Sequence, residues 1–170
     1  MSETPAAPAV AKRTRARMLA LQALCAFDVQ GDAFAAALGE FLNDPVNFVD
    51  LGWRGRCEPE VVSLAREFAE GAWAHHAQCD ALISRHVTDW SLERLQPVDR
   101  NIIRLGLYEL LEMPGTPPAV VINEAVELAR IFGGTDSPAF VNGVLDGLRR
   151  EILAASAPPA STGRETDATG

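Results

Sequence analysis

The stretch that decides the fold reads PVDRNIIRLGLYELL (97–111), VINEAVELA (121–129) and AFVNGVLD (139–146). Apolar residues recur every three or four positions in each segment, which is the spacing of an amphipathic helix. Turn signals separate the segments, PGTPP over 114–118 and GGTDSP over 133–138. In the second turn, Asp136 can cap a helix that holds Pro138 in its first turn. The chain nowhere alternates apolar and polar residues with period two, so the sequence predicts an all-α fold.

Four more helical segments precede these three, which predicts a bundle of about seven helices. They cover 12–30, 32–42, 59–87 (as one helix or a broken pair) and 92–95. Gly31 ends the first of them and Asp32 can cap the second. The segment 43–59 is rich in Gly, Pro and Asp and is expected to be a loop, and 88–91 is expected to be a turn. Pro59 suits the first turn of the helix that follows the loop.

Length and composition predict one domain over 12–155. A chain of 170 residues with 48% hydrophobic residues can bury a substantial core. Residues 1–11 are small and Pro-rich and are expected to form a flexible arm, and 156–170 read as a disordered tail. No apolar run approaches the ~20 residues of a membrane helix, and the N-terminus lacks a signal-peptide pattern. The three cysteines form no CxxC pair, so we expect reduced thiols in the cytoplasm.

The charge balance restricts how this chain could bind nucleic acid. A net charge of -8 excludes attraction by the protein as a whole. Phosphate recognition needs only a local basic patch. The sequence therefore predicts a small basic site on an otherwise acidic body.

The start of the first helix carries the candidate basic site. Lys12, Arg13, Arg15 and Arg17 place four cations within six residues. Cations are unfavourable at a helix N-terminus, by roughly 0.3–1 kcal/mol each, so an outside anion such as RNA phosphate would compensate them. The alternative is a solvated cluster that favours solubility.

The turn between the last two helices is the second candidate. Phe132 and Phe140 flank it and could stack unpaired bases or belong to the core, while Asp136 could accept from a base edge or cap the helix. Asn142 and Gly143 lie inside the last helix, where glycine costs ~1 kcal/mol relative to alanine. Asn142 could bond a neighbouring backbone and Gly143 could admit another helix. Three further polar residues are expected in ordinary roles: Asn123 and Glu124 as caps, and Glu109 on the surface.

Two long motifs resemble the NusB family of bacterial transcription antitermination factors. The first is ARMLALQAL over 16–24, after the basic start; the second is Phe-Gly…Asp-Ser…Phe-Val-Asn-Gly-Val-Leu-Asp over 132–146. The resemblance implies two packed helical sub-bundles, with RNA bound at the basic start, at Gln22 and at the corner formed by Phe132, Asp136, Phe140 and Asn142. Cys25 stands where family members usually have tyrosine.

The resemblance also implies partners. NusB-family proteins pair with the ribosomal protein NusE, bind the boxA element of nascent RNA as single strand, and join RNA polymerase with NusA and NusG, chiefly on ribosomal RNA operons. Asp99 occupies an acidic family position associated with NusE, although it could equally favour the dipole of its own helix. Whether free chains form a homodimer is left open by the sequence.

We expect neither an enzyme nor a cofactor. The sequence holds no GxGxxG, P-loop or GxSxG motif. His75 and Cys79 are spaced like half a zinc site, but no second pair accompanies them, so no metal site is expected. The alternative function is a helical scaffold that binds protein and never RNA.

Overall fold

Helices make up the regular structure of the described residues. The computed structural model describes residues 10–87 and 92–157. The elements are α1 (Lys12–Gln30), η1 (Gly31–Ala36), α2 (Leu38–Asn43), α3 (Pro45–Asp50), α4 (Pro59–Ala74), α5 (His76–His86), η2 (Leu92–Arg94), α6 (Pro97–Glu112), α7 (Pro118–Phe132) and α8 (Ser137–Ser156). The prediction of an all-α chain is confirmed, with eight α-helices in the described part and two short 3₁₀ helices. The turn expected at 88–91 and most of both expected terminal segments lie outside the described residues.

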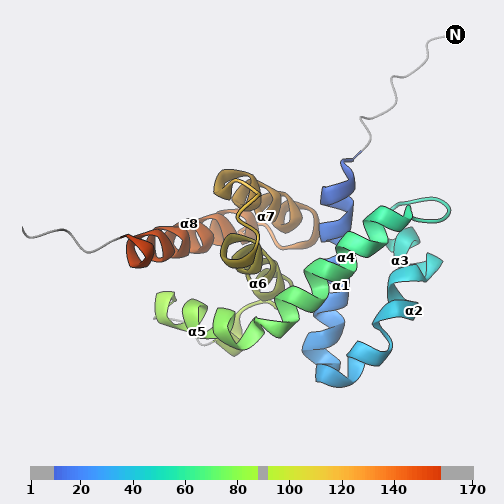
Figure 1. The fold of residues 1–170 in the computed structure, drawn as a ribbon, viewed down its shortest axis with the longest axis horizontal. Helices are drawn as coiled ribbons and strands as arrows, with labels where there is room; N and C mark the ends of the chain where they lie inside the picture. Colours follow the sequence, from blue (N-terminus) through green and yellow to red (C-terminus); the bar gives the residue numbers. More distant parts are fainter. Residues whose placement is uncertain (1–9, 88–91, 158–170) are drawn as a thin grey trace, which may run out of the picture.

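The helices form two packed sub-bundles, as expected (Figure 1). In the first, α1 packs along α4, and α2 covers both. In the second, α6 is surrounded by α5, α7 and α8, and it also contacts α1 and α4. A Cβ atom on Gly106 of α6 would lie 2.9 Å from Leu145 Cδ1 of α8, so glycine is what lets these two helices approach. The core therefore runs through α1, α4 and α6 from one sub-bundle to the other.

Proline starts most of the long helices. Pro59, Pro97 and Pro118 occupy the first turns of α4, α6 and α7, where a missing N–H costs nothing. The segment expected to run from Pro59 towards Val87 is a broken pair, α4 and α5, which meet at His75. No described helix is long and apolar enough to cross a membrane.

Two expectations for the first sub-bundle are wrong. The loop expected over 43–59 contains α3, which begins where the Asp44 side chain accepts a hydrogen bond from the Val46 backbone N–H at 2.9 Å. Asp32 caps no helix: its carboxylate accepts from Trp73 Nε1 on α4 at 2.8 Å. Asp32 could have bonded its own backbone, but its side chain bonds a donor that lies 41 positions further along the chain.

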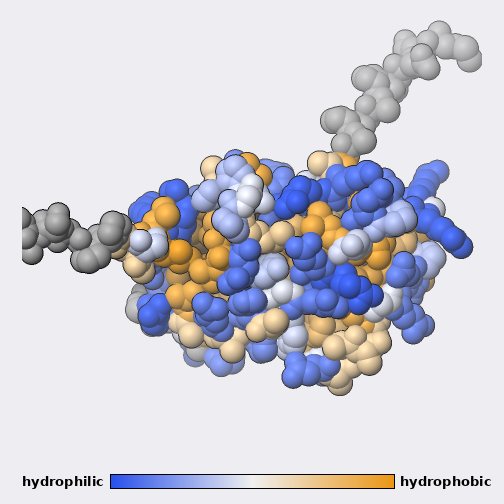
Figure 2. Space-filling model, in the orientation of Figure 1, coloured by the Kyte–Doolittle hydropathy of each residue, from blue (hydrophilic) through white to orange (hydrophobic). Residues whose placement is uncertain are grey.

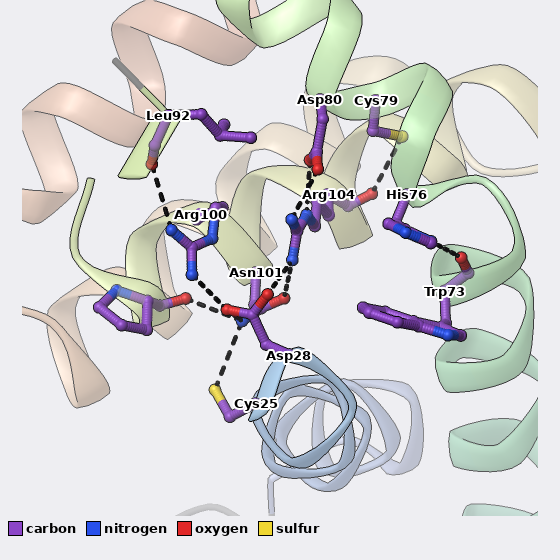
Figure 3. A network of polar contacts seen from close by, with 11 residues as sticks. Cys25, Asp28, Trp73, His76, Cys79, Asp80, Leu92, Arg100, Asn101 and Arg104 are labelled. Carbon is purple, nitrogen blue, oxygen red and sulfur yellow. Dashed lines mark hydrogen bonds and ion pairs between the residues drawn. The ribbon is translucent and has the colours of Figure 1, made fainter. Parts of the chain in front are cut away.

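A buried polar network joins the end of α1 to α5 and α6 (Figure 3). Arg104 donates to both oxygens of Asp80 at 2.7 Å, and its third nitrogen donates to Asp28 at 2.8 Å. Arg100 bonds the second oxygen of Asp28, and Asn101 Nδ2 donates to the Pro97 carbonyl at 2.9 Å. Because these residues come from three helices, the network fixes the second sub-bundle against α1.

Candidate nucleic-acid interface

The start of α1 exposes two of the four predicted cations. Lys12 is exposed, and its Nζ lies 3.7 Å from Oε2 of Glu60. This is a weak ion pair on a solvent-exposed surface. Arg13 is exposed, donates to Thr116 Oγ1 at 3.2 Å and forms no ion pair among the described residues. Its guanidinium also lies 5.7 Å from the centre of the Phe68 ring. Arg13 is thus held in place at the surface while its charge remains uncompensated.

Arg15 is engaged by its own chain. Nη1 donates to both carboxylate oxygens of Glu58, at 2.7 and 2.9 Å, and the guanidinium lies 4.6 Å from the centre of the Trp53 ring. The pKa of the Glu58 carboxyl is lowered, first by a hydrogen bond from its own backbone and then by Arg15. Since Glu58 immediately precedes α4, this contact ties the start of α1 to the start of α4.

Arg17 is buried, with 2% of its surface exposed. Nε and Nη2 each donate to one oxygen of Glu109 at 2.7 Å, and Nη1 lies 3.4 Å from Glu124. Burial works to lower the pKa of Arg17, but the bonds and charges of Glu109 and Glu124 outweigh it and raise that pKa. Arg17 therefore presents no charge to an outside phosphate, contrary to the expectation from the sequence.

The carboxylates that compensate Arg17 also differ from expectation. Glu109, expected on the surface, is 2% exposed. Because α7 begins at Pro118, Asn123 and Glu124 lie in its second turn and cap nothing. Glu124 instead accepts from Thr14 Oγ1 at 2.7 Å as well as from Arg17. Two of the four unfavourable cations are thus compensated by carboxylates inside the molecule.

The remaining α1 residues lie apart from the cations. Gln22 is half-buried, and its Oε1 has no hydrogen-bond partner among the described residues. Cys25 is half-buried and accepts a weak hydrogen bond from Asn101 Nδ2 at 3.8 Å. Burial, together with the charge of Asp28, raises the pKa of the Cys25 thiol. Cys25 thus belongs to the network that joins the sub-bundles.

The corner between α7 and α8 forms a pocket of about 700 Å³. It brings together four residues that the sequence singled out: Asp99, Phe132, Asp136 and Phe140. The segment 94–99 forms one wall and the turn 132–140 forms the other. Both phenylalanines are half-buried and pack against the core, so each serves the core and the pocket at once.

A buried carboxylate forms part of this pocket. Asp99 is 6% exposed, and its Oδ2 accepts from Ser137 Oγ at 2.9 Å. The Ser137 hydroxyl in turn accepts from the Gly134 backbone N–H at 2.9 Å. Oδ1 of Asp99 is buried and has no hydrogen-bond partner in the described part of the chain. The wall of the pocket therefore holds a buried carboxylate with one oxygen that no hydrogen bond within the described residues satisfies.

Asp136 occupies the cap position of α8 but does not cap it. Its side chain makes no capping hydrogen bond, and its backbone has helical angles. The turn is instead closed by Ser137 through its bond to Gly134. Asp136 is exposed, so its carboxylate remains available at the edge of the pocket.

Asn142 and Gly143 lie one turn further along α8, outside the pocket lining. Both are exposed. A Cβ atom on Gly143 would meet nothing within 4 Å, so the interpretation that this glycine admits another helix is wrong. Asn142 makes no hydrogen bond to a neighbouring backbone in the described structure, which leaves its amide open to solvent.

Sequence reasoning missed several residues of these two sites. Arg94 is exposed and lines the pocket, but it lies in a short helical piece without any motif. Ser137 belongs to the family motif and to a helix start, but nothing in the sequence predicts its bond to Asp99. Glu58 and Glu124 are separated from their arginines by 43 and 107 positions, so no local pattern could have paired them.

Comparison with known proteins identifies the family of this chain. The family model described as the NusB family matches residues 14–150. The chain belongs to the NusB family. A transcription antitermination protein NusB from Solibacter usitatus (strain Ellin6076) is 40% identical over 151 residues, covering 89% of this chain and 97% of that protein.

Solved NusB structures share the fold. NusB of T. maritima matches with a TM-score of 0.66 at 33% identity, over 88% of this chain and 94% of that one. A crystal structure of the antitermination factors NusB and NusE in complex with dsRNA matches with a TM-score of 0.66 at 25% identity, over 82% of this chain and 97% of that one. The family match covers the whole corner pocket of this NusB-family chain, whereas Lys12 and Arg13 precede it and depend on their own geometry.

Proposed function

We propose that this NusB-family transcription antitermination factor binds single-stranded boxA RNA together with NusE. The complex would act in the cytoplasm by joining RNA polymerase with NusA and NusG, chiefly during ribosomal RNA transcription. The observation that carries the proposal is the corner pocket, where two aromatic rings and two carboxylates surround about 700 Å³. The likeness to a NusB bound to NusE and dsRNA supports it.

The corner supplies the chemistry for unpaired bases. Phe132 and Phe140 offer ring faces at opposite sides of the turn, and stacking of a base on an aromatic ring is worth ~1–3 kcal/mol. The exposed carboxylate of Asp136 can accept a hydrogen bond from the amino group of a base. The exposed Asn142 amide extends the same surface along α8, and Gln22 is the corresponding polar residue on α1.

The basic start supplies the phosphate contacts. Arg13 is the strongest candidate because it is exposed, positioned by Thr116 and without an ion pair among the described residues. Lys12 adds a second charge, since its contact with Glu60 at 3.7 Å is weak and wet. Arg15 could contact a phosphate only while it remains bonded to Glu58. Arg17 is bonded to Glu109 in the core and holds the start of α1 in place without contacting RNA.

NusE would meet the other wall of the pocket. Asp99 lies on the side formed by 94–99, and its negative charge in the pocket wall would attract a basic side chain of a ribosomal protein. RNA would lie along the opposite wall, the turn 132–140. One pocket would then contact both partners, which explains why we expect NusE to strengthen RNA binding.

The test is fluorescence anisotropy with labelled boxA RNA and a scrambled control, with and without NusE. We expect weak binding by the chain alone and tighter, selective binding with NusE. Phe140→Ala should weaken binding by about 5- to 150-fold, the equivalent of one lost stack. Equal binding of both RNAs would reduce the site to a nonspecific cation cluster. No RNA binding even with NusE would favour a helical scaffold that binds protein alone.

A further inference from the structure

The loop between α3 and α4, residues 51–58, is held against the start of α1. Trp53 stacks on Phe48, with ring centres 6.2 Å apart, and its backbone N–H donates to the Phe48 carbonyl at 2.8 Å. Its other neighbour is Arg15 of α1, which lies over the Trp53 ring and bonds Glu58 at the end of the loop. The inner side chains of this loop therefore fix its position relative to the basic start.

Two glycines turn the outer side chains away from this anchor. Gly52 and Gly55 have φ values of 74° and 83°, a region that favours glycine. Arg54 lies between them and Arg56 follows, and both arginines are exposed. The loop thus packs its tryptophan inward and leaves two guanidinium groups outside.

Neither guanidinium has a carboxylate partner among the described residues. Most other cations of the described chain are paired with carboxylates: Lys12, Arg15, Arg17, Arg66, Arg100, Arg104, Arg130, Arg149 and Arg150. Arg13, Arg85 and Arg94 are also without an ion pair in the described structure, although the net charge of -8 offers carboxylates in excess. Arg54 and Arg56 share this property with Arg13, which lies at the same end of the molecule.

Three arginines at this end form no ion pair within the described residues: Arg13, Arg54 and Arg56. Lys12 and Arg15, by contrast, pair with Glu60 and Glu58. The exposed carboxylates nearby include Asp50 at the end of α3, and Glu67 and Glu112, which line a pocket together with Arg13. Figure 2 shows strongly hydrophilic side chains over the α3–α4 loop beside the start of α1.

We propose that Arg54 and Arg56 form a second phosphate-binding segment for single-stranded RNA, continuous with Arg13. The inference rests on the proposed RNA-binding function and extends its footprint from α1 onto the α3–α4 loop. It also explains how the site retains three unpaired cations although Arg15 and Arg17 are committed to Glu58 and Glu109. In this arrangement, Arg15 positions the loop and the loop contacts the RNA.

The test compares salt dependence in three full-length proteins: wild type, Arg54→Ala/Arg56→Ala, and the control Arg85→Ala/Arg150→Ala. The control changes net charge equally but alters α5 and α8, away from the start of α1 (Figure 1). The plot of log K against log salt has a negative slope, and each lost phosphate contact with single-stranded RNA reduces the magnitude of this slope by about 0.7. The slope of the loop variant should thus be about 1.4 smaller in magnitude than that of the wild type. The affinity ratio of wild type to loop variant should therefore shrink about sevenfold between about 50 and 200 mM salt.

The measurement uses boxA RNA with NusE present, and circular dichroism checks that all three proteins are folded. A reduced slope in the loop variant with a wild-type slope in the control supports the inference. Wild-type binding with an unchanged slope in the loop variant overturns the inference and leaves the proposed function intact. Equal slope losses in both variants would show a general charge effect and would also overturn it. Failure of the wild type to bind boxA RNA would remove both proposals.

Discussion

Two buried carboxylates on the same helix show how differently the two candidate sites use charge. Glu109, in the last turns of α6, is 2% exposed and receives two hydrogen bonds of 2.7 Å from Arg17. Asp99, in the first turn of α6, is 6% exposed, but only one of its oxygens is bonded. Both oxygens of Glu109 are thus bonded within the fold, whereas Asp99 has one buried oxygen without a partner among the described residues, in the wall of the pocket.

Because two carboxylates of one helix differ in this way, the residue type alone does not indicate which charged residues bind a partner. The basic start resembles a phosphate site in sequence, yet two of its three arginines are occupied by Glu58 and Glu109. The corner is less conspicuous in sequence, yet it brings two half-buried rings to a pocket, beside a carboxylate oxygen without a hydrogen-bond partner in the described chain. A charge compensated inside the molecule is committed to the fold, since removing its partner would leave a buried charge alone, and one that is left uncompensated can bind a partner.

The largest expected effect comes from breaking the internal pair. Glu109→Gln leaves the Arg17 charge buried with only Glu124 at 3.4 Å. Removing one partner of a buried ion pair costs about 3–5 kcal/mol. We expect a loss of this size in the free energy of unfolding, measured by urea denaturation at pH 7.

A double substitution separates this explanation from simple loss of packing. Arg17→Met/Glu109→Leu removes both charges and fills similar volume, and such replacements are often neutral in stability. The double variant should therefore be more stable than Glu109→Gln. If both variants lose the same free energy, the pair does not stabilise the fold in the way described.

Most of the fold could be predicted from the sequence because its signals are local. Pro59 and Pro97 marked two helix starts, and Gly31 and Gly133 marked the ends of α1 and α7. Pro118, which begins α7, falls in the segment predicted to be a turn. The short helix α3 was missed because six residues are too few to show a helical period. Asp32 was misassigned because a donor far along the chain, Trp73, competes with the local backbone for its carboxylate.

The site was predicted less completely, for the opposite reason. The motif residues Phe132, Asp136 and Phe140 are close in sequence and do line one pocket. The fate of Arg17 depends on Glu109, 92 positions away, and only the packing of α1 on α6 brings them together. Arg54 and Arg56 carry no motif, and their importance appears only once their neighbours are seen to be paired.

An intermediate effect is expected at the network of Figure 3, a second case of internally used charge. Burial acts to raise the pKa of Asp28, but hydrogen bonds and charges from Arg100 and Arg104 lower it below its usual value. Asp28→Asn should cost about 2 kcal/mol near neutral pH, the typical loss for hydrogen bonds to charged groups.

The pH dependence gives this prediction its sign. A carboxylate whose pKa is lowered by folding stabilises the protein fully above its unfolded pKa, about 3.9, and this contribution disappears as pH falls through the folded-state pKa. The stability gap between wild type and Asp28→Asn should thus be constant from pH 7 to about pH 5 and narrow in stronger acid. Urea denaturation over this range measures the gap; a gap that widens in acid would contradict the assignment.

The smallest effect on stability is expected for Asp99, the second of the two buried carboxylates of α6. Asp99→Asn keeps an oxygen that can accept the hydrogen bond from Ser137. The substitution destabilises the protein by removing a favourable charge from the first turn of α6, worth about 0.3–1 kcal/mol. It also stabilises the protein by removing a buried charge whose Oδ1 has no partner among the described residues. These terms oppose each other, so the free energy of unfolding should change by less than about 1 kcal/mol. NusE binding, measured by calorimetry, should weaken nonetheless, because a basic donor loses the charge it pairs with. A large loss of stability with unchanged NusE binding would place Asp99 with Glu109 among the charges that serve the fold alone.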